Sequence, residues 1–397
     1  MDQRVSRMKF LYLTGAADAA CTALGANSGR VGAEEDKEET TASEGKLTRV
    51  EQGQVAYGEN TYISPLAEVF GEIFVGTGVF VASNTVLRAA PERRLAIGNQ
   101  TNIQDNCIVR ALEGDSRIST ETSLAHHAVV RDCEIGNFVF IGFNAEVRNC
   151  TLGNGVFIQH GARVENVELA ENAYVDVGEV ITTQKQADDL PTAEPATEEF
   201  RREVLDVNAE FAESYVTLFE KKGYRSTIDV GPQPVTSFNP DSVEPQLGNN
   251  VKLGEFTRIV GDVRIGDGTR VGQRAAIRAD EGAPIVIGRG SNIRNRVTFH
   301  ALKGTAIRIG DALFSGDDAV IHGPLEMGNG VQVGDRAVVF RVSVEDGVNI
   351  GEAALVVGPA SESGELTLTI PAGTVVPDGA IIKSQDDLDE LENLRLP

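Results

Sequence analysis

Aliphatic residues recur along most of this chain at every sixth position, and each is followed by a small or polar residue. Such pairs include Ile97-Gly98, Ile135-Gly136, Ile141-Gly142, Leu152-Gly153, Ile265-Gly266, Ile287-Gly288, Ile309-Gly310 and Ile350-Gly351. A period of six fits neither a helix nor an alternating strand. It is typical of a chain that makes a short strand, turns a corner and returns to the same place after three steps. The pattern therefore predicts parallel β-helices built from hexapeptide repeats.

Two blocks of these repeats are separated by a helical segment. The repeats cover about 55–190 and 246–383, and apolar residues at helical spacing predict a helix over 197–222. A proline-rich stretch follows this helix, and a short acidic helix is expected at the end of the second block. We therefore divide the chain into a leader over 1–48, a first β-helix with its α-helix over 49–224, a linker over 225–245, and a second β-helix over 246–397.

The composition of the chain indicates which binding partners and cellular locations to expect. The chain of 397 residues carries 59 acids against 36 bases, a formal charge of -23, which disfavours nucleic acid and anionic membranes. No run of about 18 apolar residues predicts a membrane span. The four cysteines form no CxxC pair, so buried reduced thiols are expected. A cytoplasmic location is expected, with export as a lipoprotein as the alternative, because residues 9–21 faintly resemble a lipoprotein signal.

The two blocks repeat each other, but their histidines are complementary. Arg110 and His300 are 190 residues apart, while His126 with Asp317 and Arg131 with His322 are each 191 apart. Each of these pairs marks one column, that is, one equivalent position in the two blocks. In the three columns the first block has Arg, His and Arg, and the second block has His, Asp and His. Together they hold one histidine in every column. Three imidazoles suit a catalytic zinc with an open fourth position, so we predict a metal site shared between the blocks by His126, His300 and His322.

Two further histidines are not expected to be ligands. His127 follows His126, and alternation along a strand would point its side chain away, towards solvent. His160 lies near a corner of the repeat, where a surface position is expected.

The ordered motifs along both blocks resemble the γ-class carbonic anhydrases, which are left-handed β-helices that form trimers with zinc at their interfaces. In the first block the matching segments are Thr101–Asp105, Ser123–His126, Thr182–Gln184, Asp188–Pro191 and Val207-Asn208, and in the second they are Pro234–Pro240, Arg278–Gly282, Ser291–Ile293, His300–Leu302 and His322–Pro324. The resemblance implies an all-β fold of two tandem left-handed parallel β-helices, the first followed by an α-helix.

The resemblance also implies roles for particular residues. His300 and His322 match the family's pair of ligands from one subunit, and His126 matches the neighbour's ligand. Gln104 matches the glutamine that orients the reacting water, Arg278 and Asp280 match an interface ion pair, and Glu281 and Asn208 match residues near the metal. Carbonic anhydrase activity on CO₂ and bicarbonate follows, with Zn²⁺ as the metal and Fe²⁺ as the alternative. The expected partners are further copies or other β-helix subunits.

Other interpretations stay open at this point. Loss of ligands within each block also fits a non-catalytic assembly protein. If each block assembled only with itself, His300, His322 and Asp317 would form the sole metal set; at a contact of the opposite kind, Asp317 would approach Arg110 and Arg131. A hexapeptide acyltransferase is a third class, which the segments Arg278–Gly282 and His322–Pro324 disfavour.

Overall fold

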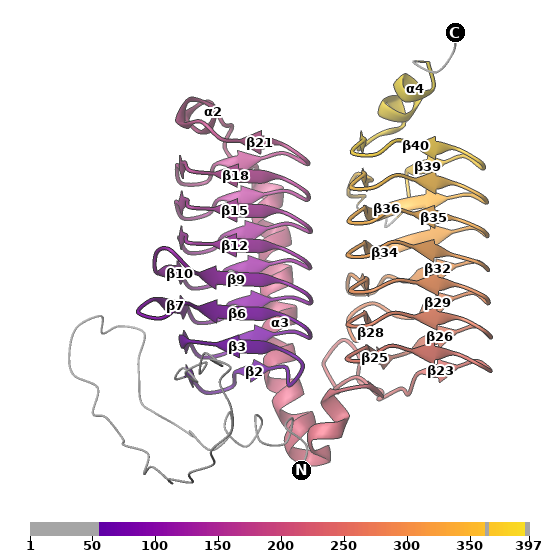
Figure 1. The fold of residues 1–397 in the computed structure, drawn as a ribbon, viewed down its shortest axis with the longest axis horizontal. Helices are drawn as coiled ribbons and strands as arrows, with labels where there is room; N and C mark the ends of the chain where they lie inside the picture. Colours follow the sequence, from indigo (N-terminus) through magenta and orange to yellow (C-terminus); the bar gives the residue numbers. More distant parts are fainter. Residues whose placement is uncertain (1–54, 362–364, 394–397) are drawn as a thin grey trace, which may run out of the picture.

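Two three-sided β-helices, here called the first and second prism, make up the protein (Figure 1). The computed structural model describes residues 55–361 and 365–393, and the predicted leader over 1–48 lies outside the described residues. All strands within each prism pair in parallel, one coil above the next. The predicted fold of two tandem left-handed parallel β-helices is confirmed.

The first prism has three faces of seven strands each. One face contains β1 (Val55–Tyr57), β4 (Glu72–Val75), β7 (Arg94–Ile97), β10 (Ser116–Ile118), β13 (Glu134–Ile135), β16 (Thr151–Leu152) and β19 (Glu168–Leu169). The next contains β2 (Tyr62–Ile63), β5 (Phe80–Val81), β8 (Asn102–Ile103), β11 (Ser123–Leu124), β14 (Phe140–Ile141), β17 (Phe157–Ile158) and β20 (Tyr174–Val175). The third contains β3 (Glu68–Phe70), β6 (Val86–Ala89), β9 (Ile108–Ala111), β12 (Val129–Arg131), β15 (Glu146–Arg148), β18 (Arg163–Glu165) and β21 (Val180–Ile181).

The second prism has the same construction, with two of its faces joined by long strands that turn a corner. The joined faces contain β22 (Val230–Gly231), β23 (Gln246–Leu247), β25 (Arg258–Gly261), β26 (Val263–Ile265), β28 (Ala276–Ala279), β29 (Ile285–Ile287), β31 (Thr298–Ala301), β32 (Ile307–Ile309), β34 (Val320–Met327), β36 (Val338–Val344), β38 (Leu355–Val357), β39 (Leu368–Ile370) and β41 (Ile381–Ile382). The remaining face contains β24 (Lys252–Leu253), β27 (Arg270–Val271), β30 (Asn292–Ile293), β33 (Phe314–Ser315), β35 (Gln332–Val333), β37 (Asn349–Ile350) and β40 (Val375–Val376).

The repeat pattern explains the core of each prism. The inward aliphatic residue of each coil stacks on its counterpart in the next coil, and the column Ile103, Leu124, Ile141, Ile158 and Val175 is completely buried. Cys107, Cys133 and Cys150 lie buried in the same core and form no disulfide. Corner residues adopt left-handed backbone conformations, such as Asn84 at φ 60° and Asn106 at φ 60°, which favours asparagine and glycine there.

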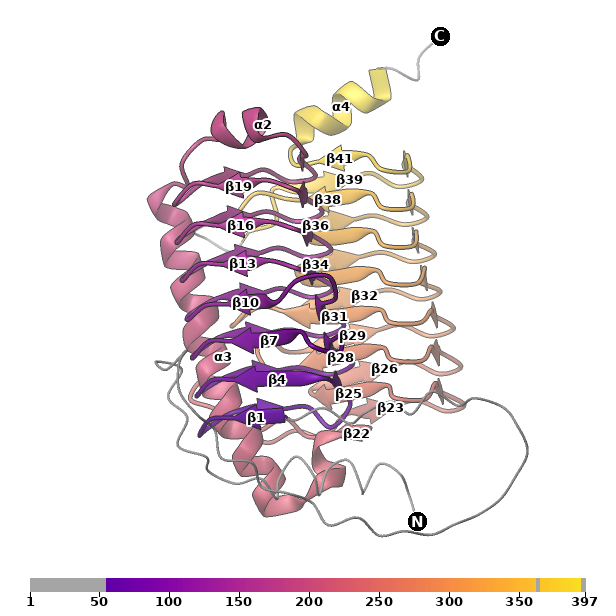
Figure 2. The same ribbon diagram turned by 60° about the vertical axis from the view of Figure 1, so that its left-hand side comes forward.

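A long helix determines how the prisms sit together. α3 (Pro195–Lys222) starts with proline in its first turn and ends before Gly223 at φ 78°, as helix termini favour. Beyond α2 (Gln184–Asp188), it runs back along the first prism, so the second prism starts at the same end as the first (Figures 1 and 2). α4 (Gln385–Asn393) follows the last coil. No helix among the described residues is both long and apolar enough to cross a membrane.

The prisms touch through unlike surfaces at matching heights. A corner of the first prism faces the sheet formed by β25, β28, β31, β34, β36 and β38 of the second. Amide groups of Asn84, Asn106 and Asn144 donate to the main-chain oxygens of Arg274, Arg296 and Arg336, which are 190, 190 and 192 residues further along. Equivalent coils of the two repeats therefore lie level with one another.

Candidate metal centre

Three histidines meet where the two prisms touch. His126 lies at a corner of the first prism after β11, whereas His300 in β31 and His322 in β34 are paired neighbours in the second. Their ring centroids are 5.1, 5.3 and 5.7 Å apart, and each offers a nitrogen within 4.8 Å of the others. All three side chains are buried. The structure thus brings the three predicted ligands together within one chain.

At least one nitrogen of each ring is free of hydrogen bonds within the described part of the chain. Nδ1 of His322 lies 2.9 Å from the main-chain oxygen of Gly323, and Nε2 of His300 lies 3.2 Å from Oδ1 of Asp280. Each contact suits a protonated nitrogen, so the opposite nitrogen keeps its lone pair. Nδ1 of His300 and Nε2 of His126 are buried without a hydrogen-bond partner in the described part of the chain. Unpaired buried acceptors facing one point fit a metal ligand set.

Burial also keeps two of these rings neutral. Desolvation lowers the pKa of His126 to about 3, although Asp105 acts in the opposite direction. Desolvation, together with the neighbouring His300 and His126, lowers the pKa of His322 well below its ordinary value. Neutral imidazole is the form that binds a metal ion. His126 and His322 are therefore in their metal-binding form over a broad pH range.

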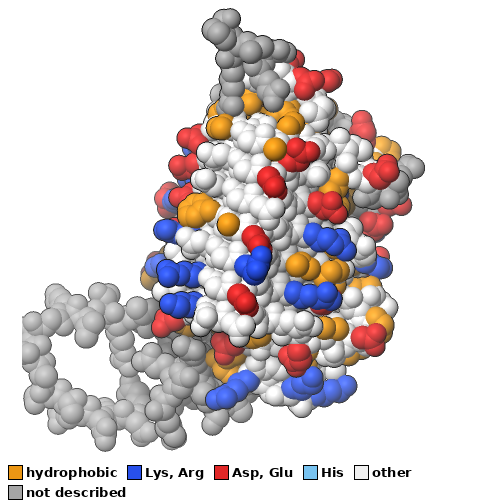
Figure 3. Space-filling view, turned by 90° about the vertical axis from the view of Figure 1, so that its right-hand side faces the viewer, with side chains coloured by type: hydrophobic (Ala, Val, Ile, Leu, Met, Phe, Trp, Pro, Cys, Tyr) orange, Lys and Arg blue, Asp and Glu red, His pale blue; other side chains and the backbone are white. Residues whose placement is uncertain are grey.

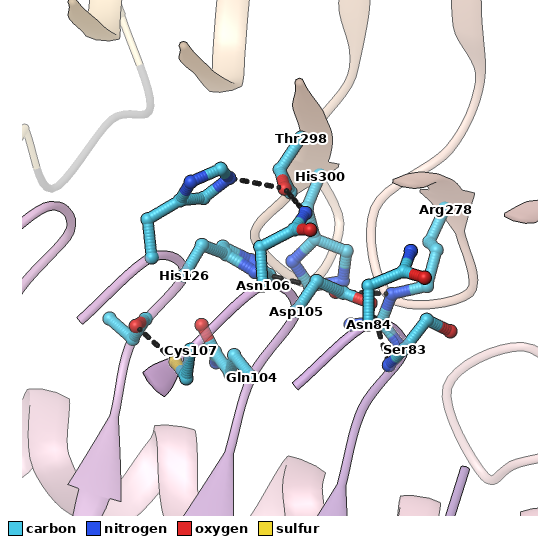
Figure 4. Close-up of polar contacts among 12 residues, drawn as sticks. Ser83, Asn84, Gln104, Asp105, Asn106, Cys107, His126, Arg278, Thr298 and His300 are labelled. Atoms are coloured by element: carbon cyan, nitrogen blue, oxygen red, sulfur yellow. Dashed lines mark hydrogen bonds and ion pairs between the residues drawn. The ribbon is translucent and has the colours of Figure 1, made fainter. Parts of the chain in front are cut away.

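A buried arginine joins two carboxylates behind the histidines. Arg278 Nε lies 2.9 Å from Asp105 Oδ2, as an ion pair without the alignment of a hydrogen bond, and Arg278 Nη1 donates to Asp280 Oδ2 at 2.8 Å. Asp105 is also 3.4 Å from Nδ1 of His126. Figure 4 shows Asp105 between His126 and Arg278. Each carboxylate thus supports one histidine, and the arginine spans the contact between the prisms.

The charges of this cluster compensate one another. Burial opposes ionisation of Asp105 and Asp280, but Arg278 and the adjacent histidines hold the pKa of both carboxyls below the usual range. Tyr215 of α3 donates to Asp280 Oδ2 at 2.5 Å. No role in the site was predicted for Asp105 or Tyr215 from the sequence. The role of Asp105 could have been predicted from the register of adjacent coils, because that register places Asp105 beside His126.

The other predicted site residues differ in how close they lie. Glu281 Oε2 is 3.8 Å from His300 Nε2, its Oε1 accepts from the Lys303 amide, and burial raises its pKa. The buried Oε1 of Gln104 has no hydrogen-bond partner among the described residues. Asn208 is buried on α3 and donates to Val204, but no contact of the described residues joins it to the histidines. Of these three residues, Glu281 is the one that contacts a ligand histidine in the described part of the chain, and Asp280 lies closer still to the same ring.

Aromatic rings cover one side of the three histidines. His160 is one of these rings, so the surface position expected for it was wrong. Phe143 stacks on His126 at 5.6 Å and on His322 at 4.8 Å, while Phe340 meets His322 edge-on at 5.0 Å. His160 stacks on Phe143 at 4.3 Å and is only 4% exposed. It does lie at a corner, but the second prism covers that corner. The side of the second prism shown in Figure 3 has charged residues of both signs and no visible histidine.

His127 is also buried, so the expected solvent position was wrong. The residue lies in a turn with φ 63°, where the strand alternation assumed for it does not apply. Its Nε2 is 2.9 Å from Thr298 Oγ1, and its Nδ1 is 3.6 Å from Asp318 Oδ1 in the second prism. His127 is part of the contact between prisms and stands apart from the three-histidine set.

Comparisons with known proteins agree with this architecture. No protein-family model matches the chain. A carbonic anhydrase of Methanosarcina thermophila is 28% identical over 177 residues, which are 40% of this chain and 68% of that enzyme. Carboxysome assembly protein CcmM of Nostoc is 31% identical over 172 residues, 41% of this chain but only 29% of CcmM. Gamma carbonic anhydrase 1 of Arabidopsis thaliana mitochondria is 28% identical over 91 residues, 21% of this chain and 33% of that protein.

Each of these matches covers less than half of this chain, and the chain contains two similar prisms. By name they are a carbonic anhydrase, a mitochondrial gamma carbonic anhydrase and a carboxysome assembly protein. Together with the paired hexapeptide prisms and the buried histidines between them, these matches show that the chain is similar to the γ-class carbonic anhydrases and to CcmM, with two hexapeptide-repeat β-helices in one polypeptide.

Proposed function

We propose that this chain is a metal-dependent carbonic anhydrase that interconverts CO₂ and bicarbonate at one site between its prisms. The observation that carries the proposal is the buried triangle of His126, His300 and His322, with ring centroids 5.1 to 5.7 Å apart. Three imidazoles suit Zn²⁺ with an open position, and Fe²⁺ is the alternative. Such an ion acidifies a water ligand and so supplies a nucleophile near neutral pH, for which carbonic anhydrase is the standard example.

The surrounding side chains would hold the substrates and move the proton. Within the described ranges, the buried Oε1 of Gln104 has no hydrogen-bond partner, so it can accept a hydrogen bond from the reacting water. Glu281 is a buried carboxyl with a raised pKa beside His300, so it is our candidate for taking up the proton. Phe143 and Phe340 form an apolar wall that suits CO₂ better than a charged ligand.

The test measures metal content and CO₂ hydration in the full chain. We expect one metal ion per chain, and we expect His126→Ala to lose both the metal and the activity. His127→Asn is the matched control, because asparagine occupies the equivalent left-handed corners at Asn106 and Asn144. The proposal fails if His126→Ala keeps its full metal content, or if the metal-loaded chain shows no CO₂ hydration.

A non-catalytic assembly function is the second candidate, favoured by the similarity to CcmM. It predicts a chain that holds its fold and binds metal without accelerating CO₂ hydration. Stopped-flow hydration measurements on the metal-loaded protein separate the two, because the catalytic proposal requires a rate that falls when Glu281→Gln or Gln104→Ala is introduced.

A further inference from the structure

Arg341 lies where the second prism, the first prism and α3 meet. It follows Phe340 in β36, at a corner where its backbone is left-handed with φ 54°. Its guanidinium carbon lies 4.4 Å from the ring centroid of Phe340 and 5.8 Å from that of Phe200 on α3. It also acts on His160 of the first prism, whose pKa is lowered to about 3 by burial and by the charge of Arg341. The guanidinium therefore faces three separate parts of the fold.

The contacts of this guanidinium are with aromatic rings. Phe200 meets Phe140 edge-on at 5.5 Å, and His160 meets Phe340 edge-on at 5.6 Å. His160 is neutral near pH 7 because its pKa is lowered. We call Phe140, His160, Phe200 and Phe340 the aromatic junction. Such rings attract a cation through their faces, but they carry no negative charge to balance it.

No acid in the described part of the chain balances the charge of Arg341. Within residues 55–361 and 365–393, its guanidinium forms neither an ion pair nor a hydrogen bond. Burial lowers the pKa of Arg341 to about 10, the direction expected for a cation that is partly removed from water. The side chain is still charged at neutral pH, so a negatively charged partner would stabilise it there.

Two buried arginines elsewhere in the chain have acceptors within the protein. Arg258 donates to three main-chain oxygens, each at 3.1 Å. Arg278 pairs with the carboxylates of Asp105 and Asp280. Arg341 contacts aromatic faces instead, so its N–H groups stay available to a ligand from solution.

A guanidinium beside aromatic rings selects a particular kind of anion. Ring contacts use the flat faces of the guanidinium, whereas its five N–H groups point outwards in the plane. A planar oxyanion accepts two parallel hydrogen bonds from that edge, which a halide ion cannot do. One positive charge among apolar rings suits an anion with one negative charge. The expected ligand is therefore a small, singly charged oxyanion.

The aromatic junction also borders the metal centre. Phe340 meets the predicted ligand His322 edge-on at 5.0 Å, so one phenyl ring contacts both His322 and Arg341. The reaction proposed for the metal centre produces or consumes bicarbonate. Bicarbonate is itself a small, planar and singly charged oxyanion, so it has the chemistry that the guanidinium selects.

We propose that Arg341 binds bicarbonate at the aromatic junction and so forms a second anion site beside the metal centre. The site holds the anion close to the metal centre as it arrives or leaves. The choice of bicarbonate rests on the proposed function, whereas binding of the anion needs only the guanidinium and requires no metal ion. Binding can therefore be tested separately from catalysis.

The test measures bicarbonate binding to the full chain with chelator present, from the broadening of the NMR signal of ¹³C-labelled bicarbonate at pH 8. We expect a Kd of about 1–10 mM, in the range of a contact made by a few hydrogen bonds, and no competition from chloride at equal ionic strength. Arg341→Met should weaken binding by about fivefold or more, and Arg341→Lys should weaken it less, because an ammonium keeps the charge but lacks the fork of N–H groups. Arg308→Met is the matched control, because it removes the same charge from an exposed position in β32.

Three outcomes would each overturn the proposal. They are a metal-free wild type that does not broaden the signal, an Arg341→Met variant that binds as the wild type does, and an Arg308→Met variant that weakens binding equally. Circular dichroism checks that the variants are folded, and Arg341→Lys serves as the test if Arg341→Met is not. A chain that binds bicarbonate through Arg341 but does not hydrate CO₂ when loaded with metal would keep this site and lose the proposed activity, and the reverse result would do the opposite.

Discussion

Arg278 neutralises two buried carboxylates at the contact between the prisms, those of Asp105 and Asp280. Its replacement tests how much this charge cluster stabilises the fold. Arg278→Met leaves Asp105 and Asp280 buried without the cation that holds both ionised. Removing one partner of a buried ion pair costs about 3–5 kcal/mol. Here two carboxylates lose one shared arginine, so we expect a loss of unfolding free energy in that range for the metal-free protein at pH 7.5.

The pKa values of Asp105 and Asp280 determine how the cost of Arg278→Met changes with pH. In the wild type both carboxyls have a lowered pKa, so their contribution is present above the unfolded value and is lost only as pH falls below it. Without Arg278, burial instead raises both pKa values, and the folded protein takes up protons more readily. The difference between wild type and variant should therefore shrink as pH falls from 7.5 towards 5.

Urea denaturation with chelator present, followed by circular dichroism, measures this difference. Arg264→Met is the matched control, because Arg264 also pairs with an aspartate two residues away, at 2.9 Å, but with half of its side chain exposed. An exposed pair contributes about 0–1 kcal/mol. If Arg278→Met costs no more than Arg264→Met, or if its cost is the same at pH 5 as at pH 7.5, the proposed charge balance is incorrect.

Three further changes probe the interface and the site. Gly161→Ala, at φ 65° and with its new Cβ 2.5 Å from Leu355 Cδ1, should lower the melting temperature more than Gly304→Ala, which has φ 73° and open space around it. Tyr215→Phe should cost about 1.5–3 kcal/mol in urea denaturation, because Asp280 loses a buried hydrogen bond to a charged group. Since burial lowers the pKa of His126 to about 3, the NMR signals of its ring in the metal-free protein should not titrate between pH 7.5 and 5, whereas a midpoint near pH 6.5 would show that the ring is accessible to water.

Local sequence pattern was enough to predict the two prisms and the meeting of three histidines between them. The six-residue spacing depends only on short strands and corners, so it determined the fold without knowledge of distant contacts. The offset of 190 to 191 residues then placed Arg110, His126 and His300 in comparable columns. Those columns predicted that one histidine set would be complete only across the two prisms, and the structure places the three rings together.

The burial of other corner residues between the prisms could not be predicted from the sequence. His127 and His160 are corner residues, and a corner of an isolated prism faces solvent. Docking of the second prism buries both, against Thr298 and Phe340 respectively. Nothing in the repeat around either residue indicates which corner becomes covered, because that depends on how α3 returns the chain to the base of the first prism.

The location of the metal site links ligand binding to the arrangement of the prisms. His126 comes from one prism and His300 and His322 from the other, so a metal ion held by all three binds only when the prisms are docked. Its binding free energy is then added to the stability of the contact. Arg278 stabilises the same contact through Asp105 and Asp280 whether or not metal is bound. Chelation should accordingly loosen the contact without separating the prisms, because the charge cluster and the apolar residues around Phe143 remain in place.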